Sequence, residues 1–427
     1  MFALSTLTSG NNFGKLALWA KHMNFKIMSS TSFHKMQRTY LISTVDEYWE
    51  KQQREVLSSF EGHKLIVMGD GRNDSPGHSA QYCSYTMMEY DSKKILTLRT
   101  LDKRSTDRKS TNMEKVGFEQ AIQKLTDNNI AVEEVVTDAH LGIGSIMKKK
   151  YPEIKHSHDI WHAAKNLGKR LGKIVKKKAN QILIPWLKDI VNHFWFACSK
   201  ADSYEEFLVC NICSIWRGVL HHITNKHEWI LSQGTGINGC LHDPLDENEV
   251  REKPWLSTSD HARVLQDLSA VILDKRFLSK VSYYLNYRTT ADIEVFHQLI
   301  LMYCAKRFAY TPPVYRIRNL LAAIDHNYHS NRPLKTNKDG EIRYHRCYNK
   351  KSKRWSVFPE KVAKTYGYVP EIAEMLYKKR IKDKVGMGKK MVLEEGDPRR
   401  LAKHLAPESP PSTSAIVQAK QTRFKRK

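Results

Sequence analysis

Short apolar runs alternate with amphipathic stretches between Lys64 and Asn166, and this alternation constrains the fold more than any other feature of the sequence. Apolar or alternating runs predict β-strands, and apolar residues spaced three or four apart predict helices. The predicted strands are at residues 64–68, 79–90, 93–101, 131–137 and 154–158. The predicted helices are at residues 112–127, 139–150 and 160–177. This order, β-β-β-α-β-α-β-α, indicates an α/β fold with a mixed sheet.

A helical region interrupts this pattern. From Ile182 to about Leu285 the sequence is irregular and rich in Trp, His and Cys, and an amphipathic helix follows at Ala291–Lys306. We therefore expect an all-helical insertion before the last helices of the α/β domain. We expect Trp186, Trp195 and Trp216 to pack in the core of the insertion.

The chain of 427 residues carries 70 Lys and Arg residues against 45 Asp and Glu residues, a formal net charge of +25. Such a charge favours a polyanionic partner, nucleic acid first and an acidic membrane second. No run of apolar residues is long enough to span a bilayer, so no membrane segment is predicted. The seven scattered cysteines are typical of a reducing compartment rather than of a disulfide framework.

The positive charge is concentrated in two places. Twelve basic residues and two acidic ones lie between Lys148 and Lys188, which predicts a groove for a phosphate backbone, with a solvated cationic helix as the alternative. The candidate DNA-binding residues are Lys165, Lys169, Arg170, Lys173, Lys176, Lys177 and Lys178. The second place is the C-terminal segment at 379–427, which we expect to be a disordered basic tail, with its last five residues as a nuclear import signal or a merely solvated end.

Asp70 and Asp138 each follow an apolar run that is predicted to be a strand. Strands one and four of this order can lie side by side, and facing carboxylates need a cation such as Mg²⁺ or Mn²⁺ between them. For either residue alone, a turn at the strand end or a helix N-cap is the alternative interpretation.

A second candidate metal site combines His222, His227, Cys240 and His242, four soft or borderline ligands within 21 residues. A structural zinc ion inside the helical insertion is one interpretation of this spacing. The nearby Cys210 and Cys213 are interpreted as core thiols of a helix, although the sequence does not rank the two ligand sets.

The segment Gly69–Gly77 followed by a strand resembles the first strand of the ribonuclease H fold. Together with Tyr82–Thr86, Thr137–His140, His156–Asn166 and Glu294–His297, it is similar to a DDE-type transposase-derived family. This family is close to the Kolobok and Mutator-like elements of fish and invertebrate genomes. The resemblance covers residues 8–330, and it implies a ribonuclease H-like domain at 61–180 and 288–330 with a helical insertion at 181–287. It also implies a linker-like segment at 1–60 and an accessory basic segment at 331–378.

The resemblance implies DNA strand cleavage and transfer by two-metal chemistry, with Asp70, Asp138 and Glu294 as the catalytic triad and ligands of Mg²⁺ or Mn²⁺. Asp74 is the alternate for Asp70, and Asp292 is the rival of Glu294. Glu114 occupies the place of an extra metal-facing glutamate.

A histidine cluster follows the second aspartate of the implied triad. Asp159 and His162 resemble the Cys/Asp-x-x-His element of Mutator-like transposases, and His297 is a further supporting residue. The alternative for the cluster of His156, His158, Asp159 and His162 is a packed, hydrogen-bonded pair of histidines.

Relatives often carry an N-terminal THAP-type zinc finger, whereas no cysteine precedes Cys83 here. We therefore expect a truncated or domesticated transposase whose partners are DNA and, as in synaptic transposases, a second copy of the chain. No small-molecule substrate is expected, and the expected location is nuclear. The alternatives are a catalytically silent nucleic-acid-binding protein and an RNA-directed ribonuclease with the same metal site.

Overall fold

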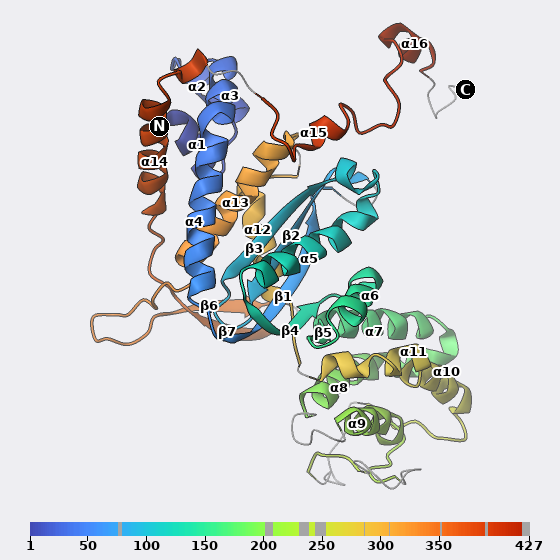
Figure 1. The fold of residues 1–427 in the computed structure, drawn as a ribbon. Helices are drawn as coiled ribbons and strands as arrows, with labels where there is room; N and C mark the ends of the chain where they lie inside the picture. Colours follow the sequence, from blue (N-terminus) through green and yellow to red (C-terminus); the bar gives the residue numbers. More distant parts are fainter. Residues whose placement is uncertain are drawn as a thin grey trace. The chain divides into compact units, whose positions relative to one another are not determined.

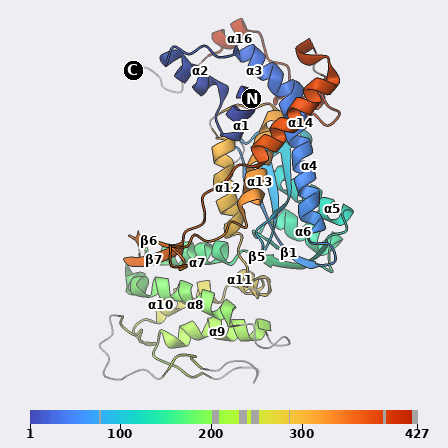
Figure 2. The ribbon, with the colours of Figure 1, turned by 90° about the vertical axis from the view of Figure 1, so that its left-hand side faces the viewer.

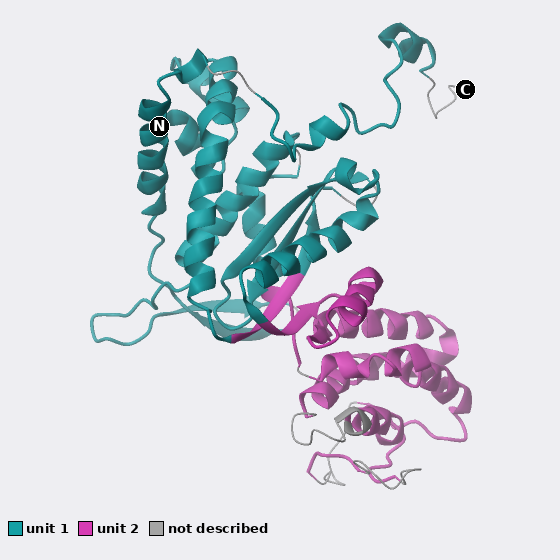
Figure 3. Ribbon diagram, in the orientation of Figure 1, with its two compact units in different colours: residues 1–63, 70–131, 293–427 teal, residues 64–69, 132–292 magenta. Residues whose placement is uncertain are grey.

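The chain forms two compact units in a computed structural model (Figure 3). Unit 1 comprises residues 1–63, 70–131 and 293–427, and unit 2 comprises residues 64–69 and 132–292. The structure describes residues 1–75, 79–200, 208–229, 239–243, 253–285, 287–306, 308–350, 352–388 and 392–420. The end of the segment Gly69–Gly77, from Pro76 on, and the basic end at 423–427 lie outside the described residues.

A mixed five-stranded sheet confirms the α/β class predicted from the sequence (Figure 1). Its strands are β1 (Lys64–Asn73), β2 (Tyr82–Glu89), β3 (Ile95–Asp102), β4 (Ala131–Thr137) and β5 (Lys155–His158). The order across the sheet is β3-β2-β1-β4-β5, so strands one and four are neighbours, as expected. β2 and β3 are antiparallel, and β4 and β5 are parallel.

β1 extends further than the apolar run that predicted it. The strand continues to Asn73, so Asp70 lies within β1 and not at its end. At Gly71 a Cβ atom would come within 2.6 Å of the Glu114 side chain, so a larger residue there would require Glu114 to move. The expectation that Asp70 follows the strand was therefore wrong, because the polar residues after Met68 continue the extended backbone.

Unit 2 contains the end of the sheet and the helical region. Its helices are α6 (Leu141–Lys150), α7 (Ile160–Ile174), α8 (Leu187–Ser199), α9 (Leu208–His222), α10 (Ala262–Ile272) and α11 (Lys275–Leu278), with 3-10 turns η4 (Lys178–Trp186) and η7 (Val281–Tyr284). Trp186 and Trp216 are buried in one apolar core, and Trp195 packs against it, so the predicted packing role of these tryptophans is confirmed. The indole of Trp216 donates a hydrogen bond of 2.9 Å to the Ile272 carbonyl, which satisfies its polar atom.

The helices of unit 1 come from distant parts of the sequence. They are α1 (Phe2–Thr8), α2 (Phe13–His22), α3 (Ser30–Met36), the π-helix η1 (Gln37–Leu41), α4 (Ile42–Ser58), η3 (Lys103–Thr106), α5 (Ser110–Asp127), α12 (Ala291–Tyr303), α13 (Pro312–His329), α14 (Tyr368–Asp383), η8 (Gly386–Gly388), α15 (Pro398–Leu401) and α16 (Thr413–Gln418). The first two residues of α12 belong to unit 2. α4 contacts α13 and α14, and the three helices lie side by side in Figure 2. An exposed hairpin joins β6 (Tyr344–Asn349) to β7 (Arg354–Pro359).

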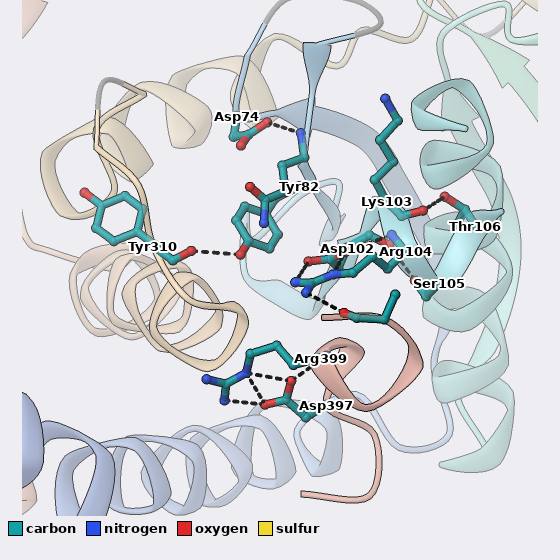
Figure 4. A network of polar contacts seen from close by, with 12 residues as sticks. Asp74, Tyr82, Asp102, Lys103, Arg104, Ser105, Thr106, Tyr310, Asp397 and Arg399 are labelled. Carbon is teal, nitrogen blue, oxygen red and sulfur yellow. Dashed lines mark hydrogen bonds and ion pairs between the residues drawn. The ribbon is translucent and has the colours of Figure 1, made fainter. Parts of the chain in front are cut away.

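Both terminal segments contain ordered elements. Residues 1–60, expected as a linker-like segment, form α1–α4 with apolar residues buried. In the segment expected as a tail, α14 continues to Asp383, whose carboxylate accepts a hydrogen bond from the Tyr40 hydroxyl. Further along, the Ala402 carbonyl accepts a hydrogen bond of 3.1 Å from Arg104, which also pairs with Asp102 (Figure 4).

No helix among the described residues is both long enough and apolar enough to cross a bilayer.

A buried ion pair joins β4 to the segment before α12 within unit 2. The carboxylate of Glu134, of which only 3% is exposed, accepts two hydrogen bonds of 3.0 and 3.1 Å from Arg288. It also accepts one from the Ser157 hydroxyl on β5. Such a carboxylate depends on its partner, because an unpaired charge in the interior is costly.

We expect Arg288→Met to lower the free energy of unfolding by about 3–5 kcal/mol, since it leaves the buried Glu134 carboxylate without its guanidinium. Urea unfolding followed by circular dichroism measures this. The matched control is Arg217→Met on the exposed face of α9, which should change stability by less than about 0.5 kcal/mol. Adding Glu134→Gln to Arg288→Met should recover part of the loss, and an equal loss in the control would contradict the assignment.

Candidate metal centre

Asp138, Asp159 and His162 come together at one edge of the sheet in unit 2. Asp138 follows β4 directly, and Asp159 follows β5. These strands are parallel, and Thr137 pairs with His158, so the next residue of each strand emerges at the same edge. The Asp159 N–H donates to the Thr137 carbonyl at 3.0 Å and fixes this register. One ligand atom from each of the three side chains lies within 4.8 Å of the others.

The Asp159 carboxylate is the buried anchor of this site. It caps the N-terminus of α7 by accepting hydrogen bonds from the backbone of Trp161 and His162 at 2.6 and 3.3 Å. It also accepts bonds from the Thr290 backbone and hydroxyl at 3.1 and 2.6 Å. Burial works to raise the pKa of Asp159, but the bonds from His162 and Thr290 outweigh it, so the net shift is downward. The carboxylate is therefore ionised near neutral pH.

His162 lies between the two aspartates. Its Nδ1 atom is 3.0 Å from Asp138 and 3.3 Å from Asp159. The hydrogen bond to Asp138, followed by that to Asp159, raises the pKa of His162 to about 10. The imidazole is therefore a cation between two carboxylates near neutral pH, and a divalent ion bound by the same atoms would replace its proton.

The other two histidines of the predicted cluster have a packing role. Burial lowers the pKa of His156 to about 4 and that of His158 to about 3, so both are neutral near pH 7. His158 stacks on Tyr283 with ring centroids 4.2 Å apart. His156 lies 2.8 Å from the Thr137 hydroxyl. The packed interpretation therefore holds for these two side chains and not for His162.

Unit 1 holds a second group of acidic residues around Asp70. The Asp70 carboxylate lies 3.5 Å from Nδ1 of His297, which projects from α12. Burial, followed by the nearby Arg72 and Lys306 charges, lowers the pKa of His297 to about 3, so this contact joins a carboxylate to a neutral ring. Glu114 packs on Gly71, the residue after Asp70.

The two candidates for the third acid differ in position. Glu294 is exposed and lies three residues before His297 on α12, so both occupy one face of that helix. Asp292 is half-buried and belongs to unit 2, in the first turn of α12.

Asp74 has a structural role in the loop after β1. Its carboxylate accepts a hydrogen bond of 3.0 Å from the Gln81 backbone, which is the dashed line drawn from Asp74 in Figure 4. It accepts another of 3.1 Å from the Ser75 hydroxyl. Its own N–H donates to the Tyr82 carbonyl. These bonds hold Asp74 against the start of β2.

The basic residues of α7 divide into two groups. Arg170 pairs with Asp274 at 2.6 Å, and Lys177, beyond the end of α7, pairs with Asp267 at 2.9 Å. Lys165, Lys169 and Lys173 are exposed and four residues apart, so they form a stripe along one helix face, about 6 Å from one lysine to the next. His162 lies three residues before Lys165 on the same face. The lysine stripe therefore begins about one helical turn from His162, which contacts Asp138. Lys176 and Lys178 are exposed beyond the end of α7.

Thr290 was not predicted to be part of the site. Its hydroxyl and N–H donate hydrogen bonds to the carboxylate of Asp159, 131 residues earlier. No spacing rule connects the two positions, because the helical region lies between them.

The predicted zinc ligands His222, His227, Cys240 and His242 also come together, with one ligand atom from each within 4.8 Å of the others.

No protein family model and no curated protein sequence matches this chain. The structure thus contains two groups of side chains that can bind a metal ion. The chemistry of the ligand atoms alone indicates which ion each group would bind.

We expect NMR titration to place the His162 pKa far above 6.5, near 10, in the absence of divalent ions. Because this pKa is raised in the folded chain, its contribution to stability is complete below about pH 6.5 and is lost as the pH rises through about 10. Asp138→Asn should lower the pKa, since it removes the strongest hydrogen bond. An ordinary imidazole pKa in the unaltered chain would contradict the bridging role of His162.

Proposed function

We propose that the protein cleaves and joins DNA strands with divalent metal ions, as a transposase-derived enzyme with a ribonuclease H-like domain. The observation that carries the proposal is the meeting of Asp138, Asp159 and His162 at the edge of β4 and β5. Two carboxylates and an exposed basic helix face occur there in one place. Carboxylates supply the hard oxygen ligands that Mg²⁺ and Mn²⁺ prefer, and lysines bind phosphates.

The strand order supports the ribonuclease H-like arrangement. β1 and β4 are neighbours, β2 and β3 form an antiparallel pair, and β5 runs parallel to β4. In the proposed domain Asp70 on β1 and Asp138 after β4 act together with Glu294 on α12. Their convergence is part of the proposal, because Asp70 and Glu294 belong to unit 1 and Asp138 to unit 2.

The proposed ligands of the ions are the carboxylates of Asp70, Asp138 and Glu294, with Glu114 as an additional acid. Bound there, Mg²⁺ would activate the attacking water or 3′-hydroxyl and stabilise the leaving oxygen. Asp159 also positions its neighbours, since its oxygens accept bonds from α7 and Thr290. It holds His162 against Asp138 and anchors the start of α12.

The lysine stripe of Lys165, Lys169 and Lys173 is the proposed contact with the DNA backbone. These side chains are exposed, and no ion pair among the described residues involves them. Lys165 also lies 4.2 Å from the ring centre of Trp161, an exposed aromatic side chain at the start of the same helix. Each lysine bound to a phosphate releases counterions, which makes the affinity depend on salt. DNA as partner, a second copy of the chain and a nuclear location belong to the same proposal.

A second candidate function is DNA binding without catalysis. The observation that favours it is the position of His162, whose cationic ring already neutralises Asp138 and Asp159. A site of this kind is electrostatically satisfied without a metal ion. The two candidates share the lysine stripe and differ in whether a divalent ion replaces the His162 proton.

We expect the purified chain to nick or cut duplex DNA in the presence of Mg²⁺ or Mn²⁺ and not in EDTA. Asp138→Asn should abolish cleavage, because it removes a ligand charge, while leaving most of the DNA affinity. The matched control is Glu133→Gln, an exposed acid on the same strand, which should keep full cleavage. Gel assays on duplex DNA and on RNA–DNA hybrids measure both.

The outcomes of this assay separate the candidates. Full cleavage by the Asp138→Asn variant would contradict the catalytic role of Asp138. Metal-independent DNA binding without cleavage would favour the catalytically silent DNA-binding protein. Cleavage confined to RNA–DNA hybrids would indicate a ribonuclease.

We expect replacement of Lys165, Lys169 and Lys173 by Gln to weaken DNA binding for all sequences alike. The slope of log affinity against log salt should fall by about 0.9 for each phosphate that a lysine no longer binds. Fluorescence anisotropy at several salt concentrations measures this. The control replaces Arg170 and Lys177, whose charges pair with aspartates, and it should change the slope less. An unchanged slope in the triple variant would exclude the stripe as the DNA-binding face.

A further inference from the structure

We infer that His222, His227, Cys240 and His242 bind a structural zinc ion in the helical region of unit 2. This site is separate from the acidic centre, which is the group of Asp138, Asp159 and His162, and the proposed nuclease activity does not require it. The four side chains offer three imidazole nitrogens and one sulfur within 4.8 Å of one another. Nitrogen and sulfur ligands of this kind suit Zn²⁺ and not Mg²⁺.

The local backbone brings the four residues together. His222 is the last residue of α9, and Asn225 follows with a positive φ of 59°, which reverses the chain. Glu228 and Gly239 then form an antiparallel bridge, and the Cys240 N–H donates to the His227 carbonyl at 2.8 Å. This pairing places Cys240 beside His227, and His242 lies two residues further on.

Close packing on α9 supports the same arrangement. A Cβ atom at Gly218 would come within 2.6 Å of the Trp229 ring, so the absence of a side chain there lets Trp229 lie against the helix. The Trp229 ring also stacks on His221, with centroids 5.2 Å apart and planes 10° apart. The segment that carries His227 is thereby held next to the end of α9 by contacts that do not involve the four proposed ligands.

Hydrogen bonds orient two of the imidazoles as ligands. Nδ1 of His242 lies 2.6 Å from the Asp243 carbonyl, and Nε2 of His227 lies 3.1 Å from the Asn225 amide oxygen. A ligating histidine commonly donates its second ring N–H to such an oxygen, which fixes the tautomer and the ring orientation. The ligand atoms are then Nε2 of His242 and Nδ1 of His227.

The separations fit a tetrahedral zinc ion. Zinc–sulfur and zinc–nitrogen bonds of about 2.3 and 2.05 Å place sulfur and nitrogen about 3.6 Å apart around a tetrahedron. The Cys240 sulfur lies 3.4 Å from Nδ1 of His222. The ring centroids of the three histidines are 5.0, 5.1 and 5.3 Å apart. Four protein ligands complete the coordination sphere, which is typical of structural rather than catalytic zinc.

The site is attached to the core of the helical region. The Trp255 ring contacts the rings of His222 and His227, with centroids 5.4 and 5.7 Å apart, and Trp186 contacts His222 from the core. Beside it is a cavity of about 330 Å³, whose wall combines apolar side chains such as Phe196 and Ile215 with Cys240 and His242. A zinc ion would therefore bind the segments at 227–229 and 239–243 to α9 and close one wall of this cavity.

The test is the metal content of the full chain, expressed with zinc and purified without chelator. We expect one zinc ion per chain by mass spectrometry of the metal, and a visible cobalt spectrum with a thiolate charge-transfer band after replacement of zinc by Co²⁺. Cys240→Ala should abolish the thiolate band and reduce the zinc content several-fold. The matched control is Cys347→Ala, an exposed thiol on the β6–β7 hairpin, which should retain the zinc.

Two further variants test whether the zinc content depends on this site and not on the acidic centre. His242→Ala, at an exposed position, should reduce the zinc content while leaving the remaining fold intact by circular dichroism. Asp138→Asn should keep the zinc, so failure of the nuclease proposal and failure of this one are distinguishable. Substoichiometric zinc in the unaltered chain, or a cobalt spectrum without a thiolate band, would overturn the proposal.

Discussion

The buried carboxylate of Asp159 holds together the part of unit 2 in which the acidic centre lies. It accepts hydrogen bonds from the first turn of α7 and from both polar groups of Thr290 at the start of α12. A buried charge is stable only when such donors surround it, so these elements are fixed relative to one another within the unit. The position of His162, and through it the contact with Asp138, depends on this arrangement.

In this arrangement the proton on His162 and a divalent metal ion compete for the same carboxylates, those of Asp138 and Asp159. His162 is held between two carboxylates, and their hydrogen bonds raise its pKa to about 10. A divalent ion binds here only if it is attracted to the two carboxylates more strongly than the imidazolium is, because both cations would lie between the same carboxylates. The second proposed site differs in this respect. Its proposed ligands are imidazoles and a thiol, so nitrogen and sulfur atoms rather than carboxylate charge determine its metal.

The sequence predicted the strands, the main helices and the α/β class well, because apolar periodicity is a local property. It also predicted the packing of Trp186 and Trp216, and it selected the histidines and the cysteine that meet near the end of α9. It was wrong about Asp70, since the polar residues after Met68 continue the extended backbone to Asn73. It could not find Thr290, whose partner is 131 residues away.

The sequence by itself determined which chemical groups are available and which elements carry them: acids after the strands, lysines spaced four apart, and the ligand types near His222. The tertiary structure alone decided which of these groups meet. It made His156 and His158 neutral by burial and His162 a cation by placing it between carboxylates, although the three residues lie within seven positions of one another. The physical reason is that protonation depends on burial and on neighbouring charges, and both come from residues that only folding brings near.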